Sequence, residues 1–196
     1  MLHCLKRMFC AAALIILFAP AVNAATLNEG GLHVQPWFTD SFLILKEDVE
    51  DAHADGKRVA VFIEQRGCPY CKEMHEVNLT KPEITDFIRK NFNVIQLNMW
   101  GAREVTDIDG KTMEERDLMR RWRVNFTPTI VFLPTPDEIK NGDTEVARMP
   151  GYFKPFHFLS MFEFVEQGKY KDQVFQRFLQ DKFKRLEAEG KKPEVW

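Results

Sequence analysis

A pair of cysteines separated by two residues, Cys68-Pro69-Tyr70-Cys71, constrains this chain more than any other feature. Two thiols at this spacing are close enough to close a small disulfide ring. The run Val59–Ile63 before them predicts a strand, and the residues from Lys72 onward predict a helix. Because the free N–H groups and the dipole of a helix N-terminus favour negative charge, we expect a lowered pKa for the Cys68 thiol. The motif therefore predicts thiol–disulfide chemistry, with Cys68 as the attacking thiolate and Cys71 as the resolving thiol.

The first 24 residues match a secretory signal peptide. Lys6 and Arg7 form a short basic region, Met8–Phe18 is apolar, and Val22-Asn23-Ala24 is a small-residue cleavage site. A membrane anchor is the alternative, but the apolar run is shorter than the roughly 20 residues that a spanning helix needs. We therefore expect residues 1–24 to be removed and the mature protein to be periplasmic.

Removal of the signal peptide would take Cys4 and Cys10 with it, so that Cys68 and Cys71 would be the only thiols of the mature chain. In an exported protein, a single close pair is more typical of a working redox couple than of a structural disulfide. The 27 Lys and Arg residues are interspersed with 29 Asp and Glu residues. This balance indicates no nucleic-acid partner.

Hydrophobic periodicity predicts one α/β domain over residues 37–196, after an extended leader at residues 25–36. The continuous apolar run at 58–63 is typical of a strand buried on both faces of a parallel sheet. Further strands are predicted at 92–99, 129–133 and 145–149, the last two as an antiparallel pair, and residues 100–124 are predicted to form an insertion.

Helices are predicted between and after these strands. The first follows an N-cap at Thr39, Asp40 or Ser41 and has a core face that includes Phe42. The helix after the cysteines is expected to break near Pro82. A phenylalanine-rich C-terminal helix is expected to pack on the domain, with a partner-docking face as the alternative. The predicted helices are 39–55, 72–78, 83–91, 113–122, 155–167 and 172–189.

Two motifs together resemble the thioredoxin-like superfamily: the CxxC pair at a strand–helix junction, and Phe126-Thr127-Pro128-Thr129 before a later strand. The resemblance implies a thioredoxin-like fold, with a central mixed sheet flanked by helices, an insertion after the second strand and an added C-terminal helix. It also implies that Pro128 is cis and lies against Cys68, and that Thr127 offers backbone groups to a substrate peptide. The residues expected to dock a substrate are Pro69, Tyr70, Thr127 and Pro128.

A closer resemblance, over roughly residues 58–169, is to the SoxW-type periplasmic thioredoxins. It implies a reductive role. We separately expect a monomer that uses neither a cofactor nor a metal. A membrane thiol transporter of the CcdA or DsbD kind would supply electrons, and exported disulfide-containing proteins would receive them; in that family this role is linked to the oxidation of sulfur compounds. The motifs that carry the resemblance are Arg66–Cys71, Met74-His75, Lys81–Ile84, Gly101–Asp107, Phe126–Thr129 and Pro150–Tyr152.

Three alternative functions stay open at this stage. The same dithiol could act as an oxidase or isomerase, because direction depends on its potential relative to that of its partners. The Pro-Tyr dipeptide equals that of glutaredoxins and shifts the expected potential to more oxidising values, but the glutathione-binding motif is missing. A different class is a Cu(I) transfer module that uses Cys68, Cys71, Met74 and His75, because thiolate and thioether ligands suit Cu(I).

One departure from the thioredoxin pattern concerns proton transfer. Thioredoxins usually have a buried Asp six residues before the first cysteine, whose carboxylate moves protons to and from the resolving thiol, and this chain has Phe62 there. Glu64, at the end of the same strand, is the nearest candidate proton relay, and His75 is a poorer one. The alternatives are a Glu that faces solvent and a His on a helix surface.

Overall fold

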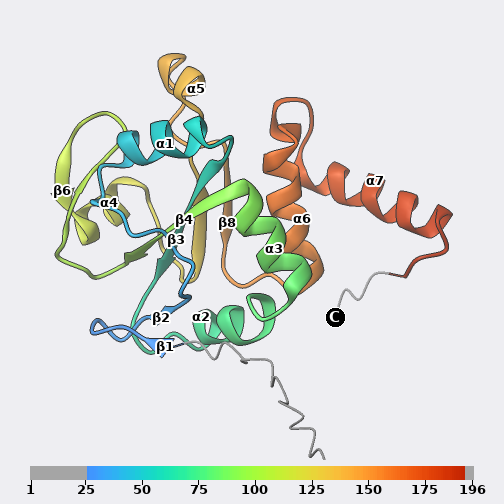
Figure 1. Ribbon diagram of the computed structural model, residues 1–196, viewed down its shortest axis with the longest axis horizontal. Helices are drawn as coiled ribbons and strands as arrows, with labels where there is room; N and C mark the ends of the chain where they lie inside the picture. Colours follow the sequence, from blue (N-terminus) through green and yellow to red (C-terminus); the bar gives the residue numbers. More distant parts are fainter. Residues whose placement is uncertain (1–25, 193–196) are drawn as a thin grey trace, which may run out of the picture.

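Residues 26–192 are described by a computed structural model of the chain, in which helices cover both faces of a sheet (Figure 1). The predicted signal peptide at residues 1–24 lies outside the described residues. Within residues 26–192, none of the helices combines the length and the apolar character needed to cross a membrane. The predicted α/β fold with a central mixed sheet is confirmed.

The main sheet has the strand order β4-β3-β7-β8. The strand β3 (Arg58–Glu64) runs parallel to β4 (Phe92–Asn98) and antiparallel to β7 (Thr129–Phe132). The predicted antiparallel pairing of the last two strands is confirmed, since β7 pairs in this way with β8 (Ala147–Pro150). A short helix that the sequence did not predict, α5 (Pro136–Lys140), connects them.

Side chains of β3 alternate between two hydrophobic clusters, one on each face of the sheet. Ala60 and Phe62 point into the first cluster, and Val61 and Ile63 point into the second; all four are fully buried. Each buried large apolar side chain contributes about 1.5–3 kcal/mol. Helices α3 (Pro82–Asn91) and α6 (Pro155–Glu166) cover the first face, and α1 (Leu45–Ala54) and α4 (Glu115–Arg121) cover the second.

The prediction for the start of the first helix was wrong, because α1 begins at Leu45 rather than near residue 40. The Ser41 hydroxyl accepts a hydrogen bond from the Leu43 N–H (2.7 Å) and donates one to Asp48 (2.8 Å). These local bonds favour a turn over a helix. Phe42, predicted to face the core, is 97% exposed as a result.

Residues within the predicted leader form a small β-hairpin from β1 (Thr26–Leu27) and β2 (His33–Val34). Strands of two residues are too short to give a periodic pattern in the sequence. The hairpin is attached to the main sheet, since the Gln96 side-chain amide on β4 donates a hydrogen bond to the His33 carbonyl (2.6 Å). Gln35, directly after the hairpin, is buried.

The insertion contains a second hairpin, formed by β5 (Glu104–Thr106) and β6 (Thr112–Glu114). Its strands were not predicted, but the turn signal at Asp109-Gly110 lies between them, and Gly110 has the left-handed φ of 83° that such a turn requires. Because Met113 and Glu114 belong to β6, α4 begins two residues later than predicted.

The segment after the cysteines begins as α2 (Pro69–Glu73) and continues as a π-helix, η1 (Met74–Asn78). The predicted break is confirmed, because α3 starts anew at Pro82. A wider π turn is common at functional sites, and this one contains His75.

At the C-terminus, a short turn, η2 (Lys169–Lys171), precedes α7 (Phe175–Ala188), which begins three residues later than predicted. Phe178 is buried in the first cluster, so the predicted packing of this helix on the domain is confirmed at that residue. Farther along α7, Lys182 is also buried and donates a hydrogen bond to Ser160 on α6 (2.9 Å).

Candidate active site

Cys68 and Cys71 are joined by a disulfide at the start of α2, with Cα atoms 5.2 Å apart. Cys68 is the N-cap of the helix, and its sulfur accepts a hydrogen bond from the Cys71 N–H (3.1 Å). Pro69 occupies the first helical turn, where its missing N–H costs nothing. Cys68 keeps 5% of its surface exposed, whereas Cys71 is fully buried. An incoming disulfide can therefore reach Cys68 first.

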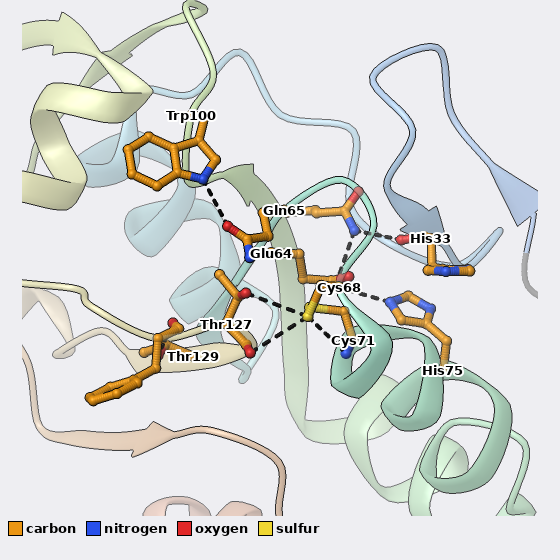
Figure 2. Close-up of a disulfide and its surroundings, with 11 residues drawn as sticks. His33, Glu64, Gln65, Cys68, Cys71, His75, Trp100, Thr127 and Thr129 are labelled. Atoms are coloured by element: carbon orange, nitrogen blue, oxygen red, sulfur yellow. Dashed lines mark hydrogen bonds and ion pairs between the residues drawn. A yellow bond between two sulfur atoms is a disulfide. The ribbon is translucent and has the colours of Figure 1, made fainter.

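The loop before β7 lies against Cys68, as Figure 2 shows. The Thr127–Pro128 peptide bond is cis. The Cys68 sulfur lies 3.4 Å from the Thr127 hydroxyl, which can donate to it, and 3.5 Å from the Thr127 carbonyl oxygen. The Thr129 hydroxyl holds the loop by donating to the Phe126 carbonyl (2.7 Å). The structure thus brings together the two motifs that the sequence analysis paired.

Tyr70, expected at the surface, is 57% exposed beside the disulfide. Its ring stacks on that of Tyr152, with centroids 6.3 Å apart. Burial, and then the nearby Glu73 carboxylate, raise the pKa of Tyr152 to about 12. The Tyr152 phenol therefore stays protonated at neutral pH, and it donates a hydrogen bond to Asn78 (2.9 Å).

Glu64 and His75 form a fully buried pair beneath the surface of the site (Figure 2). The distance between His75 Nε2 and Glu64 Oε1 is 2.9 Å. The alternatives of a solvent-facing Glu and a surface His were therefore wrong. Glu64 is buried because side chains two residues apart on a strand share a face. It therefore lies on the same face as Phe62, where η1 covers it. Thioredoxins usually have an acid at the position of Phe62, and here the acid is Glu64, two residues later on the same face of the strand.

Three residues that the sequence analysis missed complete this network. Gln96 Nε2 donates to Glu64 Oε1 (3.1 Å), and Gln35 Nε2 lies 3.2 Å from His75 Nδ1. Because an amide nitrogen only donates, Nδ1 is the acceptor, and the proton of a neutral His75 is on Nε2, directed at the carboxylate. Burial and the neighbouring His75 lower the pKa of His33, whose ring centroid is 5.8 Å from that of His75.

The second carboxylate oxygen, Glu64 Oε2, is buried and has no hydrogen-bond partner among residues 26–192. A buried carboxylate oxygen without a partner is costly, and such atoms are rare enough to need an explanation. This oxygen is able to accept a proton without first breaking a hydrogen bond.

The structure does not gather the ligands of the Cu(I) alternative. Met74 is buried in the first hydrophobic cluster, and both ring nitrogens of His75 are engaged by Gln35 and Glu64. Among residues 26–192, no three His, Cys, Asp or Glu residues form a group that could hold a metal ion.

A disulfide at a helix N-cap, opposed by a Thr-Pro loop, defines the class of protein: this is a thiol–disulfide oxidoreductase with a thioredoxin-like fold. The family model described as a thioredoxin-like domain matches residues 45–166, and the chain belongs to that family.

Solved structures of the same fold include a thioredoxin-fold protein from Helicobacter pylori, which is 25% identical, with a TM-score of 0.53 over 67% of this chain and 82% of that one. A thioredoxin from Thermus thermophilus is 29% identical, with a TM-score of 0.46 over 62% of this chain and 83% of its own. The periplasmic thioredoxin SoxS from Paracoccus pantotrophus is 24% identical, with a TM-score of 0.37 and coverage of 57% and 97%. A search of the curated proteins finds no match.

The buried pair leads to a prediction about stability. Replacing His75 by Leu removes one of the two donors to a buried carboxylate, so the free energy of unfolding should fall by about 3–5 kcal/mol. The double variant Glu64→Leu/His75→Leu should be less destabilised than the sum of its single variants, because no buried charge is left. Urea unfolding of the oxidised proteins measures both effects. A loss below 1 kcal/mol in His75→Leu, or strictly additive losses, would contradict the pairing.

Proposed function

We propose that this protein reduces disulfides in exported partner proteins through the Cys68–Cys71 dithiol. The observation that supports it best is the difference in exposure between the two cysteines: Cys68, beside Thr127, keeps 5% of its surface exposed, and Cys71 keeps none. This asymmetry assigns attack to Cys68 and resolution to Cys71. The disulfide in the structure is then the oxidised product state.

In the forward direction, the Cys68 thiolate attacks one sulfur of a substrate disulfide. A mixed disulfide forms, and the first substrate thiolate leaves and takes up a proton. Cys71 then loses its proton, attacks the Cys68 sulfur and releases the second substrate thiol. Two electrons and two protons pass to the substrate, whose disulfide becomes two thiols while Cys68 and Cys71 become a disulfide. Pro69, Tyr70 and Thr127 form the surface on which the substrate chain docks, and Pro128, which is buried, belongs to the loop that carries Thr127.

Resolution requires a base for Cys71, because a fully buried thiol cannot pass its proton directly to solvent. Cys71 and His75 are four residues apart on adjacent helical turns and therefore share a face. His75 in turn holds the Glu64 carboxylate at 2.9 Å. We assign the proton of Cys71 to Glu64, with His75 and Gln96 as positioning residues that fix the orientation of the carboxylate.

The direction and the partners of the reaction are inferred from the sequence motifs. The SoxW-type pattern over residues 58–169 supports a periplasmic reductant that receives its electrons from a membrane thiol transporter of the CcdA or DsbD kind. The predicted signal peptide at residues 1–24 supports the same compartment. In this role the protein must be reduced again after each turnover.

A trapping experiment tests the exchange scheme. The variant Cys71→Ser lacks the resolving thiol, so the mixed disulfide on Cys68 should accumulate with exported proteins and run as reductant-sensitive adducts on a gel. The matched control Cys68→Ser should trap none, because its remaining thiol is buried. Absence of adducts with Cys71→Ser, or equal adducts with both variants, would refute the assigned roles.

The oxidation state in cells tests the direction. For a reductant, we expect Cys68 and Cys71 of the wild-type protein to be mostly reduced in an oxidising periplasm, and to become oxidised when the membrane thiol transporter is deleted. Alkylation of free thiols in acid-quenched cells measures this ratio. A pair that stays oxidised in cells with an intact transporter would support the oxidase or isomerase alternative instead.

A further inference from the structure

A groove of about 460 Å³ lies beside the candidate active site, at the junction of β4, α4 and the loop before β7. Its lining combines apolar side chains with arginines. Among the residues that line it are Trp100, Arg116, Arg120, Arg123, Val124 and Asn125.

The groove adjoins the reactive disulfide. Asn125 lies two residues before Thr127, whose carbonyl oxygen is 3.5 Å from the Cys68 sulfur. On its other side, Trp100 donates from its indole N–H to the Gln65 side chain (2.7 Å), and the Gln65 carbonyl accepts from the Cys68 N–H (3.3 Å). Figure 2 shows Trp100 and Thr127 on the side of the disulfide opposite to His75. A chain bound at Cys68 can therefore continue into the groove.

Three exposed aromatic residues flank the disulfide: Tyr70 lies between the two cysteines, Phe126 directly precedes Thr127, and Trp100 bonds to Gln65. Trp100 is 64% exposed, Phe126 is 65% exposed and Tyr70 is 57% exposed. Large aromatic residues are enriched at interfaces, and exposed aromatic groups that gather around a site are typical of a docking surface. An apolar side chain of a partner would be covered on this rim.

The charge of the groove is positive, although the chain as a whole has a net charge of −2. Its lining includes Arg116, Arg120 and Arg123 and no acidic residue. Arg116 is paired with Glu114, and Arg120 is paired with Asp117. The exposed Arg123 forms no salt bridge among residues 26–192, so its charge is available to a partner.

Arg123 also occupies an unusual backbone position. Its φ of 54° is in the left-handed region, and it comes directly after Trp122, the C-cap of α4, where the Val124 N–H bonds to the Met119 carbonyl (2.9 Å). Glycine is the usual residue at this position, because a side chain is strained there. Glycine would end the helix here without strain, so an arginine at this position supports a role for its side chain at the groove.

We propose that this groove binds an extended acidic segment of the oxidised partner, next to the disulfide that Cys68 attacks. Carboxylates of the segment would pair with Arg123, and an apolar residue would pack on the rim of Trp100 and Phe126. Charge complementarity selects the partner and speeds its encounter more than it adds raw affinity. This inference rests on the proposed function and names its substrate class: proteins whose reducible disulfide is flanked by acidic and apolar residues.

Two synthetic peptides of equal length, each with one intramolecular disulfide and one flanking Leu, test the proposal. One carries Asp and Glu beside the disulfide, and the other carries Asn and Gln. For wild-type protein at low ionic strength, kcat/KM should be about fivefold higher for the acidic peptide. The preference should disappear in Arg123→Gly, which relieves the strained backbone, and reverse in Arg123→Glu.

Matched variants separate the groove from general charge effects. Arg123→Lys should keep most of the preference, and Arg89→Glu, the same charge change on α3 away from the groove, should leave it unchanged. A preference that persists in both Arg123→Gly and Arg123→Glu would overturn the proposal. So would a concentration-dependent dimer, detected by light scattering, that is lost in Arg123→Glu, because a second copy would then occupy the groove.

Failure of the proposed function itself would look different. In that case the wild-type protein would reduce neither peptide nor a small neutral disulfide such as β-hydroxyethyl disulfide. Reduction of both peptides at equal rates would instead retain the proposed function and overturn only the assignment of the groove.

Discussion

The hydrogen bond between the buried Glu64 carboxylate and His75 is the interaction on which the arrangement of the site depends. A carboxylate without solvent needs hydrogen-bond donors, and those of Glu64 Oε1 come from separate parts of the chain: His75 from the π-helix after the cysteines and Gln96 from β4. Gln35, just after the N-terminal hairpin, fixes the other nitrogen of His75. One buried charge therefore connects the hairpin, the sheet and the redox helix.

This connection explains why an apolar residue is tolerated where thioredoxins usually have an acid. Phe62 packs edge to face against Phe158 and Phe38, and so completes the aromatic core between β3 and α6. A buried carboxylate, that of Glu64, lies two residues along the same face, at the end of the strand nearest the disulfide. The core gains a large apolar side chain, and the site keeps a buried carboxylate, at the cost of the polar network that encloses Glu64.

Features that depend on local sequence could be predicted: the redox pair at a strand–helix junction, the break at Pro82, the four main strands along the chain, and the antiparallel pairing of the last two. The start of the first helix could not be predicted, because the spacing of Phe42 fits a helical face, whereas the Ser41 side chain stabilises a turn there. The network around Glu64 and His75 could not be predicted either, since Gln35 and His75, for example, are separated by 40 residues and no local pattern marks them as neighbours. Burial of a polar residue is decided by tertiary packing, which periodicity does not report.

The rate at which Cys71 resolves a mixed disulfide, measured against pH, tests the central claim that Glu64 accepts the proton of Cys71. Below about pH 8, Glu64→Gln should slow resolution at least about tenfold, and the gap should narrow only well above about pH 8.5, the pKa of a free thiol, because burial disfavours the thiolate form. The variant His75→Gln keeps a donor to the carboxylate, so its resolution rate should lie between those of the wild type and Glu64→Gln. If wild type and Glu64→Gln share one pH–rate profile in rapid-quench measurements, Glu64 has only a structural role.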